Sequence, residues 1–242
     1  MTELEMKKYS RNALLGSFVS MLTAGLATMM YSVSISTIRT DLALTAVQAG
    51  SLGTYTFMGQ MLGGMVAGYL ADRYGRKNIL IVDVILATLA VFATSLLQSY
   101  SIFGILRFIT GVGLGGCYYI ASILIGEFVP TNKRGFMSGV ATSVWNFGYV
   151  VCCAMSAFAL PSIGWRWCFR ICALPIVFVI FMIFGMKDAP SFTAAKANRD
   201  KRDKEEGRKV NAYAEIWSHP RMRKSFIIWS ISMILYFYGY YG

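Results

Sequence analysis

The run Gly68-Tyr69-Leu70-Ala71-Asp72-Arg73-Tyr74-Gly75-Arg76-Lys77 lies between two long apolar stretches of the chain. Apolar runs of this length are typical of membrane-spanning helices, so the polar run between them predicts a short loop that joins two such helices. Gly75 can adopt the positive φ that a tight turn needs, and Gly68 predicts a close approach to a neighbouring helix. Asp72 lies near the positive end of the following helix, which favours a carboxylate. We call this run the signature loop.

The composition of the whole chain agrees with a membrane protein. Of its 242 residues, 56% are hydrophobic and only 14% are charged, whereas a soluble domain carries about 25% charged residues. The apolar runs predict an all-α membrane protein with helices at residues 13–37, 46–71, 78–97, 102–126, 136–160, 168–186 and from 225 onward. We therefore expect an N-terminal segment over 1–12, a six-helix bundle over 13–186, a linker over 187–224 and the start of a seventh helix over 225–242.

The basic residues predict how these helices are oriented. If the N-terminus is cytoplasmic, nineteen of the 23 lysines and arginines fall on the cytoplasmic side, among them those of the signature loop. The outside loops then hold only Arg39, Arg166 and Arg170. This bias predicts a cytoplasmic N-terminus in the cytoplasmic (plasma) membrane, and a cytoplasmic linker whose mixed-charge run Arg199–Lys209 lies along the membrane face. The net charge of +11 then follows from topology and does not indicate a nucleic-acid partner.

The predicted fourth helix carries a second motif. It reads Arg107-Phe108-Ile109-Thr110-Gly111-Val112-Gly113-Leu114-Gly115-Gly116, reaches Glu127 near its end, and is followed by Arg134-Gly135. The glycines match the dinucleotide pattern G-x-G-x-x-G, but no strand precedes them, so they indicate a face for helix packing.

The signature loop resembles the loop after the second helix of the major facilitator superfamily of transporters. The fourth-helix motif is similar to the one shared by sugar porters and organic-ion symporters of that superfamily. The resemblance implies the N-terminal six helices of the family fold plus part of helix seven, with a missing C-terminal half. It also implies a transporter of small molecules by alternating access within the lipid bilayer, with no enzyme activity and no cofactor. The residues agree, because the chain has one histidine, no nucleophile–base pair and no metal-ligand set.

The resemblance also implies an inner gate at the cytoplasmic end of the bundle. In the family such residues pair across the two halves when the transporter faces outward, which is feasible because exposed ion pairs are worth little individually. Ordinary anchoring at the membrane interface is the alternative for the charged members. The candidate gate and signature-loop residues are Gly68, Asp72, Arg73, Gly75, Arg76, Glu127 and Arg134.

Arg107 is the sharpest candidate for a substrate contact. It lies about two turns into helix four, where an unpaired charge is costly and marks a functional position. Related proton symporters commonly place an acid of helix one opposite this arginine, but no Asp or Glu occurs between Ala13 and Thr37, and the expected place falls near Ala27. A substrate anion, or the missing half, is then expected to supply the negative charge. The alternative is that Arg107 extends to the outer interface.

Other polar and aromatic residues in the predicted helices complete a candidate substrate site. Four of them recur at helical spacing in helix five, and Tyr118 shares a predicted face with Arg107. Such a face suits a small polar or aromatic substrate, although a core-facing stripe is the competing interpretation. The expected substrate-binding residues are Arg107, Tyr31, Tyr118, Thr142, Trp145, Asn146 and Tyr149.

Asp83 is the only carboxylate within the predicted membrane runs. It is a candidate for proton coupling, since a buried acid can exchange a proton during the cycle. Pairing with the basic signature loop is the alternative, and the one that its position favours.

Together these patterns predict a transporter of a small organic anion, a carboxylate, and the family resemblance implies that transport is coupled to protons. A sugar or polyol porter is the first alternative, but Thr142 stands where sugar porters carry a glutamine. A half-size membrane scaffold or sensor that binds a ligand without moving it is the second.

Overall fold

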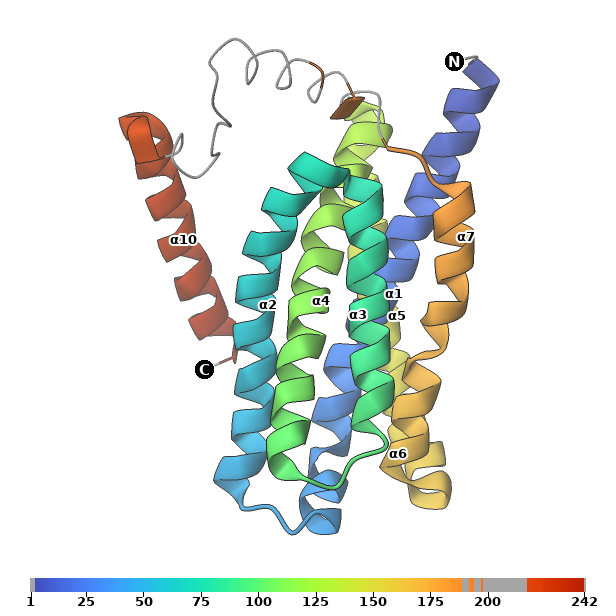
Figure 1. Ribbon diagram of the computed structural model, residues 1–242, viewed down its shortest axis with the longest axis vertical. Coiled ribbons are helices and arrows are strands. Elements are labelled where there is room, and N and C mark those ends of the chain that lie inside the picture. Colours follow the sequence, from blue (N-terminus) through green and yellow to red (C-terminus); the bar gives the residue numbers. More distant parts are fainter. Residues whose placement is uncertain (1–2, 189–191, 194–196, 198–216, 242) are drawn as a thin grey trace. The chain divides into compact units, whose positions relative to one another are not determined.

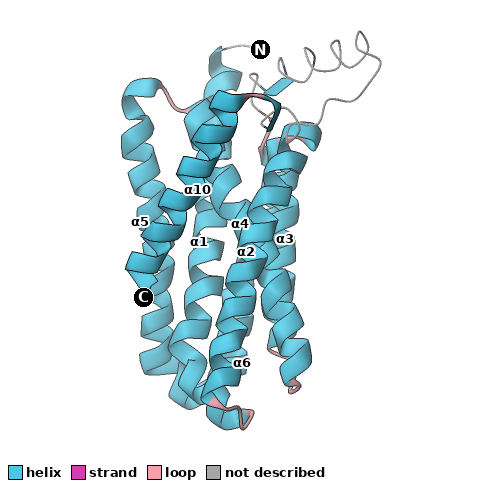
Figure 2. Cartoon of the chain, turned by 90° about the vertical axis from the view of Figure 1, so that its left-hand side faces the viewer, coloured by secondary structure: helices cyan, strands magenta, loops and turns pink. Residues whose placement is uncertain are grey.

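A computed structural model of the chain describes residues 3–188, 192–193, 197 and 217–241. Within these residues all regular structure is helical, as Figure 2 shows. The chain divides into two compact units, Met1–Thr193 and Ala194–Gly242. The all-α architecture predicted from the apolar runs is confirmed.

The first unit is a bundle of helices that run alternately up and down (Figure 1). One end of the bundle carries the signature loop and the chain segments after α4 and α7, and we call it the signature-loop end; the other we call the far end. The helices are α1 (Glu3–Asp41), α2 (Ala46–Tyr74), α3 (Arg76–Thr94), α4 (Tyr100–Phe128), α5 (Arg134–Ala154), α6 (Leu160–Cys172) and α7 (Val177–Gly185), with short turns of 3₁₀ or π helix at Thr131–Lys133, Met155–Ala159 and Leu174–Ile176.

Local sequence explains where several of these helices begin. Thr45 and Gln48 form a reciprocal capping box at the start of α2. Gly75 alone separates α2 from α3, and its φ of 104° is open to glycine but costly for other residues. The expected N-terminal segment over 1–12 is helical from Glu3, as part of α1.

The sixth predicted span differs most from expectation. The chain reverses at Gly164, where φ is 75°, so helical structure resumes at Trp165 rather than at the predicted residue 168. Pro175 then lies in a short 3₁₀ turn that separates α6 from α7. Because proline lacks a backbone N–H, it divides what was predicted as one helix over 168–186.

Among the residues that the structure describes, four helical stretches are long and apolar enough to cross a membrane, namely Tyr9–Asp41, Arg76–Thr94, Tyr100–Phe128 and Thr131–Gly185. The last of these contains the reversal at Gly164 and therefore passes the bundle twice. α2 is not among them.

The glycines of α4 form the packing face that the sequence predicts. A Cβ on Gly111 would overlap the backbone oxygen of Thr56 in α2, and one on Gly59 of α2 would overlap that of Phe108 in α4. The two backbones therefore touch where both helices lack side chains. Gly68 makes no such contact within the described residues, where nothing lies within 4 Å of the position its Cβ would take.

The bundle has two buried apolar clusters. One, nearer the signature-loop end, includes Leu80, Ile125 and Met182. The other, toward the far end, includes Phe103 and Trp165. Both fill the space between helices and fix the positions of the charged side chains described below.

The second unit contains α10 (Pro220–Tyr241). It begins five residues before the predicted residue 225, with proline at the first helical position, where no intrahelical N–H is needed. The predicted mixed-charge run Arg199–Lys209 lies outside the described residues.

Candidate functional site

Arg107 lies inside the bundle rather than at the outer interface. Its side chain is only 2% exposed. One terminal nitrogen, Nη1, donates a hydrogen bond of 3.4 Å to the backbone oxygen of Ala27 in α1, whereas Nε has no hydrogen-bond partner among the described residues. The guanidinium therefore points at the position in helix one where the sequence indicated a missing acid, and the interpretation of Arg107 as an interfacial side chain is wrong.

Tyr31 holds the other side of this guanidinium. The Arg107 Cζ atom lies 4.4 Å from the centroid of the Tyr31 ring, a cation–π distance. The Tyr31 hydroxyl donates a hydrogen bond of 2.5 Å to the backbone oxygen of Ala49 in α2. This bond fixes the ring, so three helices, α1, α2 and α4, determine where the charge of Arg107 lies.

A chain of aromatic contacts leads from Tyr31 to the far end. Phe103 lies 6.3 Å from Tyr31 and 6.0 Å from Trp165, measured between ring centroids. Trp165 Nε1 donates to Asp41 Oδ2 at 3.0 Å, and Arg166 forms an ion pair with the same oxygen at 2.5 Å. We call Asp41, Trp165 and Arg166 the far-end clasp. Sequence reasoning missed it; the only signal was an acid at the end of one apolar run and a Trp-Arg pair before another.

The predicted substrate-binding residues divide into two environments. Arg107 and Tyr31 are buried, whereas Tyr118, Thr142, Asn146 and Tyr149 are exposed on α4 and α5. Trp145 is partly buried and packs against both apolar clusters. On the predicted face of helix five, Trp145 therefore packs toward the core, whereas its three companions are exposed.

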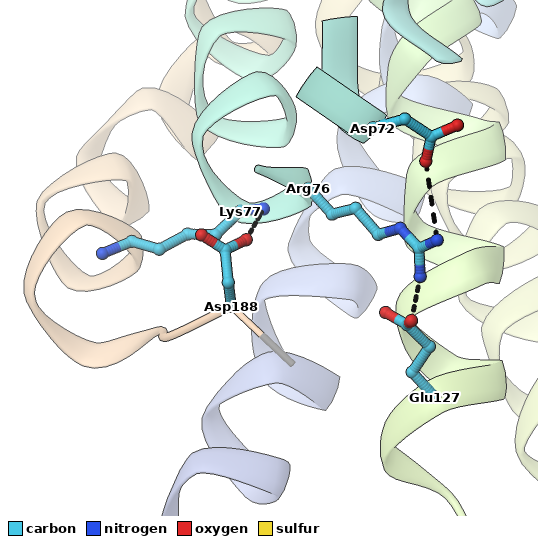
Figure 3. Close-up of polar contacts among 5 residues, drawn as sticks. All are labelled: Asp72, Arg76, Lys77, Glu127 and Asp188. Carbon is cyan, nitrogen blue, oxygen red and sulfur yellow. Dashed lines mark hydrogen bonds and ion pairs between the residues drawn. The ribbon is translucent and has the colours of Figure 1, made fainter. Parts of the chain in front are cut away.

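The signature-loop end carries a cluster of paired charges (Figure 3). Arg76, at the start of α3, forms an ion pair with Glu127 of α4 and lies 3.6 Å from Asp72 of α2. The side chains of Arg76 and Glu127 are 19% and 15% exposed, whereas Asp72 is 61% exposed. The structure thus brings three of the predicted gate residues together, and Gly75 supplies the turn between them.

Arg73 and Arg134 form different contacts. Arg73 donates to the hydroxyl of Tyr69 one turn earlier at 3.1 Å, and Arg134 donates to the backbone oxygen of Val129 at 3.0 Å. Both therefore bond within their own part of the chain rather than to a carboxylate.

Asp188 joins the signature loop from a distant part of the sequence, also drawn in Figure 3. Its Oδ1 accepts a hydrogen bond of 2.8 Å from the backbone N–H of Lys77, in the first turn of α3. Such N–H groups have no partner within their own helix, and the positive helix end favours a carboxylate. The Lys77 ammonium in turn donates to the backbone oxygen of Ile183 in α7 at 2.7 Å. Sequence reasoning did not assign this role, since 111 residues separate Asp188 from its partner.

Asp83 does not pair with the signature loop, contrary to the favoured interpretation. It is 6% exposed, and its Oδ2 has no hydrogen-bond partner. Among the residues that the structure describes, the ion pairs use Asp41, Asp72 and Glu127 only. The Asp83 carboxyl instead lies against Gly116 of α4.

Comparisons with known proteins agree on the family. The model of the Major Facilitator Superfamily matches residues 17–242. A cis,cis-muconate transport protein of Acinetobacter baylyi is 30% identical over 95% of this chain and 55% of its own length. The niacin transporter NiaP of the same species is 28% identical over 86% of this chain and 52% of its own length. The chain therefore spans about half the length of these relatives.

A solved structure also matches the bundle. The inward-open xylose transporter XylE from E. coli superposes with a TM-score of 0.69, covering 90% of this chain and 56% of that chain. Its sequence identity of 20% establishes a likeness of fold alone.

Proposed function

Because the chain belongs to the Major Facilitator Superfamily and is a multi-pass membrane protein, we propose that its bundle forms the N-terminal half of a transporter for a small organic anion. The superfamily places substrates near the middle of the membrane, between two halves that alternately open to each side. The missing C-terminal half would complete the site. The observation that carries the proposal is the buried Arg107, whose guanidinium faces a backbone oxygen and an aromatic ring rather than a carboxylate.

A buried cation without a counter-charge is costly, so its persistence favours a ligand that supplies the charge. The planar guanidinium can bind both oxygens of a carboxylate, and such charge-assisted hydrogen bonds are stronger than neutral ones. Among the described residues the buried Nε–H of Arg107 has no hydrogen-bond partner, so a ligand carboxylate that reached it would supply one. Two relatives, a muconate transport protein and a niacin transporter, support an organic acid as the substrate.

The exposed polar face would bind the rest of the substrate. Tyr118 on α4 and Thr142, Asn146 and Tyr149 on α5 are exposed in helices that also bury an apolar side. Polar side chains in a membrane-spanning helix favour a water-lined cavity over lipid. We assign this face to the cavity between the halves, with Trp145 and Tyr31 as the packed wall behind it.

The cluster at the signature-loop end would act as the inner gate. Its ion pair joins α3 to α4 within this half, and its partly exposed groups can separate at modest cost in free energy and re-pair with the missing half. With this gate, we propose that the signature-loop end and the N-terminus face the cytoplasm and that the far end faces the outside of the cell. Proton-coupled symport is the proposed energy source.

The test uses the full-length protein in proteoliposomes, loaded with unlabelled substrate, and measures exchange of labelled muconate, nicotinate and xylose. We expect exchange of at least one carboxylate, and we expect it to be lost in Arg107→Gln but retained in Arg170→Gln. Arg170 is a suitable control because its guanidinium lies over Trp167 and bonds to Ser95. Xylose exchange that does not depend on Arg107 would overturn the proposal.

A further inference from the structure

We propose that Asp83 is a proton-binding site of the transporter, closed in this conformation and able to release its proton when the seam between α3 and α4 opens at the signature-loop end. This inference rests on the transport function proposed above, and it names the group through which transport would be coupled to protons.

The carboxyl of Asp83 occupies a space that α4 leaves open for it. A Cβ added at Gly116 would overlap Asp83 Oδ2 and would lie 2.8 Å from the Cβ of Ala67 in α2. One turn earlier on α4, a Cβ at Gly113 would lie 2.6 Å from the backbone oxygen of Asp83. Three helices therefore close around this carboxyl, and Asp83 is only 6% exposed.

Among the described residues, no cation pairs with Asp83 to stabilise its ionised form. In the described part of the chain no ion pair reaches it, and one of its oxygens has no hydrogen bond. The titratable group nearby on α4 is Cys117, which is buried and uncharged as a thiol; on α2 the neighbour is Ala67. On α3 itself, Arg76 is engaged with Glu127.

The free energy of burying the Asp83 carboxyl depends strongly on whether it carries a proton. Moving an ionised carboxylate from water into the protein interior without a partner is strongly unfavourable, whereas moving the neutral acid there is much less so. In the closed conformation the carboxyl is therefore expected to carry a proton on one of its oxygens. Release requires that water or a cation reach it, so that the O–H bond breaks and the proton passes to water.

The gate cluster lies on the same seam. Arg76 precedes Asp83 by seven residues on α3, and Glu127 follows Gly116 by eleven residues on α4. These separations equal about two and three helical turns, so each pair shares one face of its helix. The Arg76–Glu127 ion pair therefore closes the end of the seam in which Asp83 is buried. Opening the gate would admit water to the carboxyl, which links proton release to the inward-open state.

The first experiment detects the proton directly. Infrared spectra of the full-length protein in lipid, at neutral pH, should contain a carbonyl stretch from a protonated carboxylic acid. We expect this band to be lost in Asp83→Asn and retained in Asp72→Asn, because Asp72 is exposed and beside Arg76. The amide of Asn resembles the neutral acid in size, so Asp83→Asn should fold with unchanged thermal stability. A spectrum that Asp83→Asn leaves unchanged would overturn the proposal.

The second experiment separates coupling from substrate binding in proteoliposomes. In Asp83→Asn we expect the uptake that a proton gradient stimulates to fall at least tenfold. Carboxylate exchange without a gradient should stay within twofold of wild type. Loss of both activities would assign Asp83 a structural role, and retention of both would show that protons bind elsewhere; either result overturns the inference. If wild type exchanges no carboxylate, the proposed function fails, and the infrared band still decides whether Asp83 holds a proton.

Discussion

Arg76 and Arg107 are arginines of the same bundle with opposite surroundings. Arg76 lies at the signature-loop end, partly exposed, between the carboxylates of Asp72 and Glu127. Arg107 lies in the interior, with the Ala27 carbonyl and the Tyr31 ring as its contacts. A partly exposed ion pair can be broken and remade at modest cost, as a gate requires. A buried lone cation gains most from a ligand that brings the opposite charge, as a binding site requires.

The largest expected effect comes from removing the buried charge. Arg107→Gln should weaken carboxylate binding by about 2–5 kcal/mol, the range for one member of a buried hydrogen-bonded charge pair. Titration calorimetry on the full-length protein measures this change, and Arg170→Gln should leave the affinity within twofold. Equal affinities in wild type and Arg107→Gln would make Arg107 a structural residue and remove the contrast with Arg76.

The second-largest effect is expected from the glycine contact between α2 and α4. Gly111→Ala should lower the free energy of unfolding by about 1–3 kcal/mol, because the added Cβ forces α2 and α4 apart at Thr56. The control is Gly50→Ala, where no atom lies within 4 Å of the new Cβ. It should be neutral or stabilising by up to about 1 kcal/mol, since alanine favours helices. Denaturant unfolding followed by circular dichroism compares the two; equal losses would contradict the glycine contact.

The gate pair should affect cycling rather than binding. Arg76→Gln removes an ion pair of intermediate exposure, which we expect to shift the balance between outward- and inward-facing states by on the order of 1 kcal/mol, about fivefold. Proteoliposome exchange should then show a lower maximal rate with KM changed less than twofold. Arg73→Gln is the matched control, because that guanidinium donates to Tyr69 rather than to an acid. A large change in KM with an unchanged rate would assign Arg76 to the substrate instead.

The smallest effect is expected at the far-end clasp. Asp41→Asn removes the charge that holds Arg166 but keeps an oxygen for Trp165. We expect the free energy of unfolding to fall by about 0.2–1 kcal/mol, the usual range for an exposed pair. The loss should shrink in high salt, which screens exposed charges. A loss that does not respond to salt would indicate that the clasp acts through packing.

The sequence predicted the parts of the fold that depend on local pattern. Apolar runs located the helices, Gly75 located the turn, and the glycines of helix four located a packing face. Prediction from the sequence failed where contacts join segments that are far apart in the chain. Gly68 was predicted to be a packing glycine, but among the described residues nothing lies within 4 Å of the position its Cβ would take. α6 and α7 are divided because Pro175 interrupts one apolar run.

The candidate site shows the same division. Counting along the chain placed Ala27 opposite Arg107, and the structure shows that contact. Helical spacing alone put Trp145 with Thr142 and Asn146, but the direction of the core was needed to separate them. Neither the bond between Asp188 and Lys77 nor the isolation of Asp83 could be predicted, since each depends on which helices are neighbours.

The most direct test of the central claim places a carboxylate where the substrate is proposed to bring one. Ala27 lies in α1 with its backbone oxygen on Arg107, so Ala27→Asp would provide an internal partner for the guanidinium. The account predicts that Ala27→Asp abolishes carboxylate binding in calorimetry, whereas Ala27→Asn, of the same size but neutral, keeps part of it. Carboxylate binding that survives equally in both variants would contradict the claim that the charge of Arg107 is kept for the substrate.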